Sequence, residues 1–411
     1  MALQDRKLKM LDDMNLAYNT KITYQRSFKK LFGFCKKESE IDYEWYNIDS
    51  QIKYLQLGDD SLQEMLERFL ESEKERVKQD IISPNSIPNY FTAYKIVLEA
   101  NYREHAVKWK PITIMYPKKE KRSGYKPWIT WQIDRMVRKC ATLKKEAAIL
   151  FQSSTGSRVG VHDHPLLMRH MIKMQAPGYD YHCYAILIYA EEDETIEEKD
   201  QRLINEENDE EDYSFFAFTN PEASYALDQY HLQRKGLGEN FVPQTPIFRG
   251  SDTHKYSTGE FYQFSGNAFR KMMGALVVQA NLGRIKKRNR FDVMIDHGFR
   301  KRFNTILKID NEINSNITEK LMQHAKGLDG TYLTPTRQQC FDEFVKAIPE
   351  LTVDEKIKKE MENQKQKEKI DDLEEKNQIL VAQNKEIEEL KQRQIDFEKK
   401  WIEKSFPGIE K

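Results

Sequence analysis

A long stretch near the carboxyl end of the chain can adopt only one regular structure. From Asp354 to Lys400 the sequence contains no glycine or proline and is rich in Glu, Lys and Gln, which predicts one uninterrupted helix. Six residues mark two seams at seven-residue intervals: Leu373, Leu380 and Ile387 on one, and Ile370, Asn377 and Asn384 on the other. This pattern predicts a short coiled coil, usually dimeric, because a buried Asn fixes the register. A lone charged helix held by ion pairs within itself is the alternative.

The whole chain is too long to fold around a single hydrophobic core. It has 411 residues, of which 39% are hydrophobic and 32% charged, so we expect several domains with a large solvated surface. No apolar run approaches the roughly 20 residues that span a bilayer, and Met1 to Asn15 lacks the apolar centre of a secretory signal. The four cysteines never occur at zinc spacing. We therefore expect a cytoplasmic protein with reduced thiols, no metal and no membrane partner.

Most of the remaining sequence has helical periodicity. Ile22 to Phe34, Leu62 to Leu70 and Ser86 to Asn101 place apolar residues on one helix face, which we interpret as core packing of a small bundle. Helical spacing returns in Trp128 to Thr155 and again from Asn220 to Leu351, where a turn-rich segment, Gly236 to Thr258, interrupts it. The predicted fold class is mainly α with a small antiparallel β-hairpin or sheet (α+β). Three domains are expected, covering residues 1–122, 123–352 and 353–411.

Two short segments have the composition of strands. Tyr181 to Ala190 and Tyr213 to Thr219 are β-branched and aromatic, which predicts an antiparallel hairpin. Between them lies an acidic insert, residues 191–212, whose only cations are Lys199 and Arg202. We expect this insert to be solvated and mobile. It could also repel DNA from that face.

Positive charge is concentrated in two places although the chain is neutral overall, with 66 basic and 66 acidic residues. One is a proline-bounded segment from Pro117 to Pro127, with the form of an interdomain linker. The other follows residue 283. The cations that we expect on DNA phosphates are Lys118, Lys119, Lys121, Arg122 and Lys126 in the first, and Arg284, Lys286, Lys287, Arg288 and Arg290 in the second. A solvated linker without a ligand explains the first segment equally well.

Four short motifs follow one another in the second half of the chain. Arg158 comes just after a glycine turn at the end of an apolar helix, and His297 and Arg300 are three residues apart on one helix face. His324 ends the motif Leu-Met-Gln-His, and Tyr332 lies in Gly-Thr-Tyr-Leu-Thr-Pro. Each motif alone is common in proteins, where such residues usually cap, pack or face solvent. Their order and spacing are much more specific.

In that order the motifs resemble the catalytic domain of tyrosine recombinases, the integrase family that shares its chemistry with type IB topoisomerases. The sequence around His324 and Tyr332 is similar to that of archaeal integrases from viruses and other mobile elements. The resemblance covers Trp128 to Leu351 well, and Thr23 to Lys126 more loosely as a helical core-binding domain that clamps DNA. Two departures stand out. Val161 follows where an acidic residue often braces the first arginine, so we expect Asp163 to orient Arg158. For the hairpin lysine of the family, Lys199 is the only candidate between the two strands.

The resemblance implies a specific catalytic role for each of these side chains. Arg158 and Arg300 would bind the phosphate oxygens, His297 and His324 would donate hydrogen bonds to them, and His297 could take the tyrosine proton. Tyr332 would attack phosphorus to form a 3′-phosphotyrosine, and Lys199 would protonate the departing 5′-oxygen. Because one phosphodiester replaces another, neither ATP nor metal is needed.

The expected protein is therefore a DNA integrase or site-specific recombinase without cofactors. It would act on double-stranded DNA as a tetramer across two duplexes, with the coiled coil adding contacts between protomers. A viral or plasmid origin would place it in the host cytoplasm or nucleoid. The alternatives are a type IB topoisomerase-like relaxase, a non-catalytic DNA-binding or architectural protein with the same fold, and a coiled-coil structural protein whose motifs are coincidental.

Overall fold

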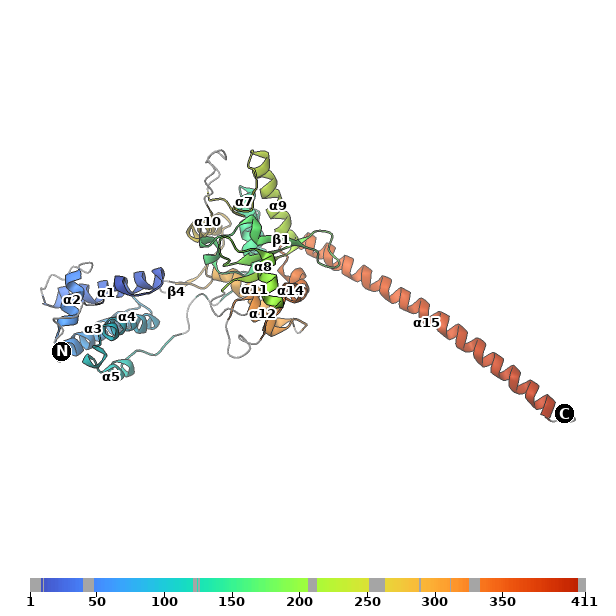
Figure 1. Ribbon diagram of the computed structural model, residues 1–411, viewed down its shortest axis with the longest axis horizontal. Coiled ribbons are helices and arrows are strands. Elements are labelled where there is room, and N and C mark those ends of the chain that lie inside the picture. Colours follow the sequence, from blue (N-terminus) through green and yellow to red (C-terminus); the bar gives the residue numbers. More distant parts are fainter. Residues whose placement is uncertain are drawn as a thin grey trace. The chain divides into compact units, whose positions relative to one another are not determined.

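The computed structural model contains two compact units (Figure 1). It describes residues 9, 11–39, 48–120, 124, 126–205, 213–250, 263–287, 290–310, 312–324 and 333–405. The first unit comprises Met1–Tyr125 with Arg284–Asp292, and the second comprises Lys126–Gly283 with Val293–Lys411. Helices dominate both units, and the second contains a small antiparallel sheet. The predicted fold class is confirmed.

The first unit is a helical bundle with an aromatic core. Its helices are α1 (Tyr18–Ser39), α2 (Ile48–Gln56), α3 (Asp59–Lys78), α4 (Ile87–Ala100) and α5 (Trp109–Ile114), with the 3-10 turns η2 (Leu11–Asp13), η3 (Pro84–Ser86) and η4 (Glu104–Ala106). The ring of Tyr94 lies edge-on to Phe28 at 5.1 Å and to Phe91 at 5.5 Å. Such edge-to-face pairs stabilise a core beyond the area they bury. The prediction that these aromatic stripes form core is confirmed.

The basic segment after residue 283 forms a small hairpin that belongs to the first unit. Its strands are β4 (Lys286–Lys287) and β5 (Arg290–Phe291), which pair antiparallel with Lys287 opposite Arg290. The backbone N–H of Ile285 donates to the Asp292 carboxylate at 2.8 Å, which closes the base of the hairpin.

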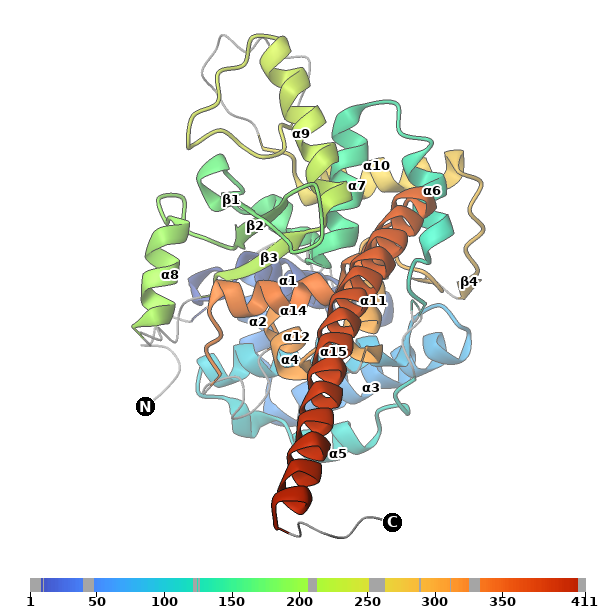
Figure 2. The same cartoon turned by 90° about the vertical axis from the view of Figure 1, so that its right-hand side faces the viewer.

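The second unit packs helices on both faces of a three-stranded sheet of order β1-β2-β3 (Figure 2). The strands are β1 (Met171–Met174), β2 (Cys183–Ile188) and β3 (Phe215–Thr219), and both pairings are antiparallel. The other elements before the tail are α6 (Thr130–Val137), α7 (Leu143–Thr155), η5 (Val159–Asp163), η6 (Met168–His170), α8 (Ile196–Ile204), α9 (Pro221–Gly236), α10 (Gly266–Gln279), α11 (His297–Ile309), α12 (Ser315–Leu321) and α14 (Arg337–Leu351).

Strand β2 is apolar throughout because both of its faces are covered. Successive side chains of a strand point to opposite sides. Accordingly, Tyr184 and Ile186 join a core with residues of α7 and α9, whereas Ala185 and Leu187 join a second core with residues of α11, α12 and α14. The predicted hairpin of β2 and β3 is confirmed. Strand β1 was not predicted, since it has only four residues and lies at the sheet edge.

The acidic insert differs from our expectation of a mobile loop, because its first part folds into helix α8. Thr195 and Glu198 form a capping box at the start of this helix, and Ile196 is buried beneath it. An ion pair of 3.0 Å between Asp200 and Arg337 joins α8 to the start of α14. A capped helix with a buried anchor can thus form despite the acidic composition. Residues 206–212 of the insert lie outside the described residues.

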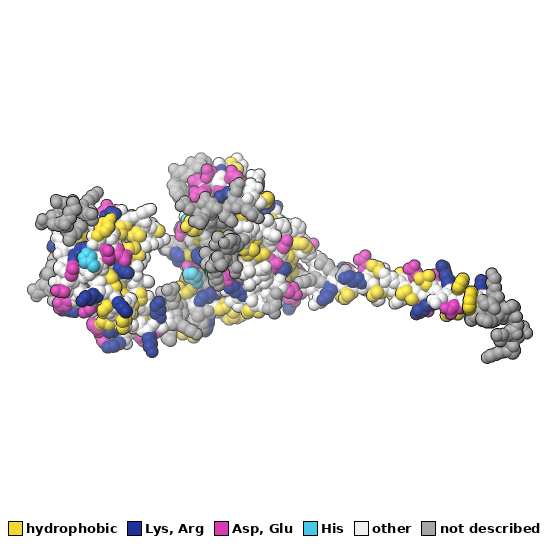
Figure 3. All heavy atoms as spheres, turned by 60° about the horizontal axis from the view of Figure 1, so that its bottom comes forward, with side chains coloured by type: hydrophobic (Ala, Val, Ile, Leu, Met, Phe, Trp, Pro, Cys, Tyr) yellow, Lys and Arg dark blue, Asp and Glu magenta, His cyan; other side chains and the backbone are white. Residues whose placement is uncertain are grey.

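Helix α15 (Glu355–Ser405) runs without interruption for 51 residues, so the prediction of one continuous helix is confirmed. Its start is fixed by Glu222, whose carboxylate accepts the backbone N–H groups of Val353 at 2.7 Å and Asp354 at 2.9 Å. Figure 3 shows hydrophobic side chains along this helix among charged ones. Residues of the predicted seam are about half exposed, with Leu373 and Leu380 at 56%. Pairing through this seam stays a prediction.

Candidate active site

Arg300 lies in the first turn of α11 with its guanidinium almost completely buried. The Nη1 group donates to the backbone oxygen of Gly156 at 3.1 Å, and Nη2 donates to the backbone oxygen of Met322. These two carbonyls belong to segments far apart in the sequence, at the end of α7 and the end of α12. The contacts fix the guanidinium in place, because a charged donor bonded to fixed acceptors loses its rotational freedom.

Arg158 stands next to Arg300 but is exposed to solvent. Helix α7 ends at Thr155 and is capped by Gly156, whose φ of +58° favours glycine and where a Cβ would overlap the Phe303 side chain. The chain then turns so that Arg158 Nη1 donates to Gln323 Oε1 at 2.7 Å. The Gln323 amide in turn donates to the Tyr213 backbone oxygen at 2.9 Å. The Gln323 amide, just after α12, therefore links Arg158 to the segment that precedes β3.

This partner differs from the one we expected for Arg158. Asp163 accepts a hydrogen bond of 2.9 Å from the backbone N–H of Gly266, at the start of α10. The carboxylate thus caps a helix whose first donors would otherwise be unsatisfied. Gln323, with a φ of +48°, takes the bracing role that we had assigned to Asp163.

His324 is held between a carboxylate and a guanidinium. Its Nδ1 lies 2.7 Å from Glu319 Oε2, and its Nε2 lies 3.0 Å from Arg300 Nη2. Because a guanidinium can only donate, Nε2 accepts, and the ring proton is on Nδ1. Burial and the Arg300 charge outweigh the Glu319 hydrogen bond and lower the pKa of His324 below its ordinary value. The imidazole is therefore neutral at pH 7.

The two arginines create a strongly cationic site. Burial, and next the charge of Arg158, lower the pKa of Arg300 to about 10, so this guanidinium remains charged at neutral pH. Their direct partners are neutral, namely two backbone carbonyls, an imidazole and an amide. Within the described ranges neither guanidinium pairs with a carboxylate. An incoming anion would relieve the repulsion between the two cations.

The structure therefore brings together three of the predicted catalytic residues, Arg158, Arg300 and His324. Sequence reasoning missed the supporting roles of Gln323 and Glu319. Gln323 precedes His324 in a motif that we had noted, but nothing in the sequence indicates that its amide meets a residue 165 positions earlier.

The other predicted catalytic residues are placed differently. His297 begins α11, exposed and three residues before Arg300, so that the two share one helix face. Tyr332 lies outside the described residues. Lys199 is buried in α8, and its charge acts on Lys320, whose pKa is lowered mainly by burial.

The predicted DNA-contacting cations are only partly described. Three of them are exposed in the amino-terminal half, Lys118, Lys119 and Lys126. In the hairpin, Lys286 is exposed, and Arg284 stacks on the Phe291 ring with its Cζ 4.0 Å from the ring centre. For Lys287 and Arg290 the structure gives only the backbone pairing of the two strands, in which they lie opposite each other. Lys121, Arg122 and Arg288 lie outside the described residues.

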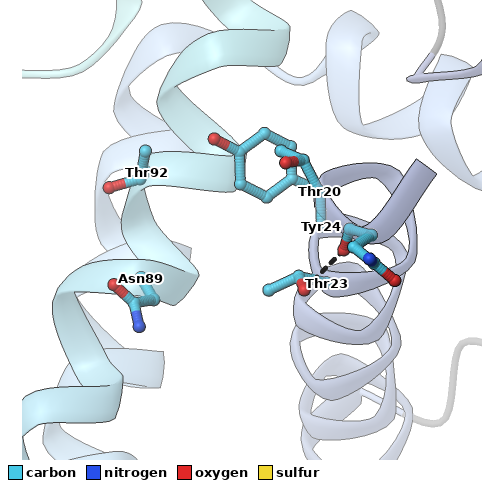
Figure 4. A pocket seen from close by; sticks show the side chains of 6 residues that line it. Thr20, Thr23, Tyr24, Asn89 and Thr92 are labelled. Atoms are coloured by element: carbon cyan, nitrogen blue, oxygen red, sulfur yellow. Dashed lines mark hydrogen bonds between the residues drawn. The ribbon is translucent and has the colours of Figure 1, made fainter. Parts of the chain in front are cut away.

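The first unit has a pocket of about 300 Å³ between α1 and α4 (Figure 4). It is lined by uncharged side chains that can form hydrogen bonds: Asn19, Thr20, Thr23 and Tyr24 from α1, and Asn89 and Thr92 from α4. The Thr23 hydroxyl donates to the Asn19 backbone oxygen at 2.8 Å. The same two helices also meet where Lys30 Nζ of α1 lies 4.0 Å from the centre of the Tyr90 ring of α4.

The described residues contain neither a metal-binding cluster nor a membrane-spanning helix. No group of three or more His, Cys, Asp or Glu side chains in that part of the chain could hold a metal ion. None of its helices is both long and apolar enough to cross a membrane.

Comparison with known proteins gives matches only among solved structures. No family model and no curated protein matches the chain. A lambda integrase dimer bound to a COC′ core site is similar, with a TM-score of 0.46 and 10% identity, covering 82% of this chain and 95% of that one. The Tn1549 transposon integrase with circular intermediate DNA gives 0.42 and 14%, covering 81% and 94%. XerA recombinase gives 0.33 and 13%, covering 79% and 98%.

Proposed function

We propose that the chain is a site-specific DNA recombinase or integrase that cuts and rejoins strands through a 3′-phosphotyrosine at Tyr332. The observation that carries this proposal is the pair of guanidiniums, Arg158 and Arg300, held by neutral groups beside His324. Neutral anchors leave both positive charges available to the non-bridging oxygens of a phosphodiester. A purely structural arginine pair would gain nothing from being left uncompensated.

The imidazole of His324 complements this phosphate site. With its Nδ1 proton on Glu319, the ring accepts the Arg300 N–H at Nε2, and Nε2 can take a proton once a bound phosphate accepts that N–H in its place. The Glu319 carboxylate then stabilises the imidazolium, as an acidic partner does in other histidine-dependent sites. His297 is exposed at the start of α11, three residues before Arg300, and would donate a hydrogen bond to the same phosphate.

The reaction itself exchanges one phosphodiester for another. Attack by the Tyr332 phenol would release the 5′-hydroxyl, and attack by a 5′-hydroxyl would later release Tyr332. Because the bond energy is kept in the phosphotyrosine, rejoining needs no ATP. The cationic arginines stabilise the added charge of the transition state, which is the work that metal ions do in other phosphoryl-transfer enzymes.

Double-stranded DNA is the proposed partner of both units. The hydroxyl and amide side chains between α1 and α4 suit hydrogen bonding to base edges. Exposed lysines, such as Lys118, Lys119 and Lys286, suit the phosphate backbone. We further propose a tetramer on two duplexes, encoded by a virus, plasmid or other mobile element, with α15 joining protomers through its seam.

A type IB topoisomerase-like relaxase is the second candidate, since it would use the same phosphate site and the same nucleophile. The seven-residue seam on α15 favours the recombinase, because a relaxase that works as a monomer has no use for an assembly helix. A non-catalytic DNA-binding protein could use the same two arginines on DNA phosphates, but it would have no use for an imidazole held in one tautomer beside them by Glu319.

Covalent trapping tests the proposal. The protein would be incubated with a library of nicked duplexes with randomised cores, and adducts would be collected after denaturation and sequenced. We expect a 3′-linked adduct that Tyr332→Phe abolishes, whereas Tyr225→Phe, on the exposed face of α9, forms it normally. An adduct that survives Tyr332→Phe would refute the assigned nucleophile. Relaxation of supercoiled plasmid without strand exchange would support the second candidate.

A further inference from the structure

Tyr189 has an unusual backbone conformation directly after β2. Its φ is +60°, in the left-handed region that side chains rarely adopt and that is costly for a bulky residue. Such strain persists only where the surroundings hold it, and it often accompanies function. Here the neighbours fix the ring: His164 lies edge-on to it at 4.8 Å, and Phe215 lies at 6.0 Å.

The hydroxyl of Tyr189 points toward the turn that carries Arg158. It lies 3.6 Å from the position that a Cβ of Gly160 would occupy, two residues after Arg158. Among the described residues the hydroxyl has no hydrogen-bond partner. A half-buried hydroxyl with a free donor can contact a ligand, because a bond to an incoming oxygen would replace one to water.

The same phenol lies in the field of both guanidiniums. Burial raises the pKa of Tyr189 above its ordinary value, while the charges of Arg158 and Arg300 act in the opposite direction. Two cations from different segments thus act on this one oxygen, and the phenol in turn acts on Arg300. The hydroxyl also lies against the turn that carries Arg158, and a phenolate formed there would be stabilised by the charges of both arginines.

The proposed reaction requires a proton donor that the arginine pair cannot supply. The departing 5′-oxygen is an alkoxide and must gain a proton, whereas guanidiniums retain theirs. The His324 N–H already bonds to Glu319. Residues 183–219 contain one lysine, Lys199, and its charge acts on Lys320 in α12.

We propose that the Tyr189 hydroxyl contacts the scissile phosphate and gives its proton to the departing 5′-oxygen; this rests on the proposed function. As the bond between Tyr332 and phosphorus forms, the Tyr332 phenol proton passes to His324 Nε2, the bond from phosphorus to the 5′-oxygen breaks, and that oxygen takes the Tyr189 proton. Tyr189 becomes a phenolate whose charge is offset by Arg158 and Arg300. During rejoining the attacking 5′-hydroxyl returns its proton to this phenolate and the departing Tyr332 oxygen regains its proton from His324, so the cycle is balanced.

A substrate with sulfur in place of the bridging 5′-oxygen isolates this step. A thiolate leaves without a proton, since thiol pKa values lie near 8.5, so loss of the donor should matter only with oxygen. Tyr189→Phe keeps the ring and its packing, and adduct formation with the oxygen substrate should fall about a hundredfold or more. With the sulfur substrate the same variant should stay within about threefold of the parent protein.

Two further variants complete the test. Tyr225→Phe should behave as the parent on both substrates, because this exposed tyrosine belongs to α9. Lys199→Met should not show the sulfur rescue, and rescue of Lys199→Met but not of Tyr189→Phe would transfer the role to the lysine. Equal losses on both substrates, or no loss on either, would refute a proton donated by Tyr189. If the parent protein forms no adduct with either substrate, it is the proposed function that fails.

Discussion

Replacing His162 by phenylalanine should reduce the loss of folding stability that acid causes in the second unit, because this histidine is buried in its core. The imidazole is 1% exposed and is surrounded by rings, stacked on Phe269 at 5.1 Å and edge-on to Phe264 at 5.6 Å. Neither ring nitrogen has a hydrogen-bond partner within the described residues. Burial lowers the pKa of His162 to about 3, because a charge in this aromatic cage would lose its hydration.

The size of the effect follows from proton linkage. The unfolded chain binds this proton below about pH 6.5, whereas the folded chain binds it only below about pH 3, so stability falls as the pH falls between these values. From pH 8 to pH 5 the unfolded state gains about 2 kcal/mol from His162 alone. His162→Phe should lose about 2 kcal/mol less than the parent over the same interval.

Urea unfolding at pH 8 and pH 5 measures this difference. Comparing variants cancels the contributions of the first unit and of other titrating groups, including His231, whose pKa burial lowers to about 4. His162→Gln is the matched control, because it removes the titration but keeps a polar side chain. It should be less stable than the phenylalanine variant at both pH values, yet equally insensitive to acid. If parent and both variants lose the same stability, the ring is not held neutral in the core.

Three other outcomes are expected. Gly156→Ala should lower stability by about 3 kcal/mol or more, measured by urea unfolding, because the residue has φ +58° and its Cβ would overlap Phe303; adding Phe303→Leu should restore little of the loss, since leucine keeps the Cβ and Cγ atoms that clash. Gln323→Glu should slow adduct formation about tenfold more than Gln323→Leu, since a carboxylate would neutralise the neighbouring arginine; similar rates would argue against an electrostatic role. Leu380→Asp should reduce the mass measured by sedimentation equilibrium if the α15 seam joins protomers, whereas Gln378→Asp, off the seam, should not.

Local patterns explain which parts of the fold could be predicted. The helices of the first unit and the pairing of β2 with β3 follow from apolar spacing within short segments, which a sequence displays directly. Strand β1 is only four residues long and takes its register from β2. Helix α8 was hidden by its acidic composition, because its stability depends on the Thr195 cap and on contacts with α14.

The residues of the candidate site also differ in whether the sequence could predict them. Arg158, Arg300 and His324 could be found because their order along the chain matches a known pattern. Gln323 and Tyr189 could not, since an amide or a phenol gains a role only from what the fold places beside it. Lys199 was selected as the one lysine in its segment; the structure buries it in α8, and its catalytic role stays a prediction.

The hydrogen-bond partners of the arginines distinguish those that stabilise the fold from those that could bind an anion. Arg234 is buried, and its guanidinium meets both oxygens of Glu239 at 2.7 Å, so its charge is cancelled and its geometry serves the fold. Arg158 is oriented by an amide and Arg300 by two backbone carbonyls, and none of these partners carries a net charge. Orientation without neutralisation keeps the potential of the site positive. A phosphate would therefore meet donors that need neither to move nor to break an ion pair, which is the condition for strong electrostatic stabilisation of a transition state.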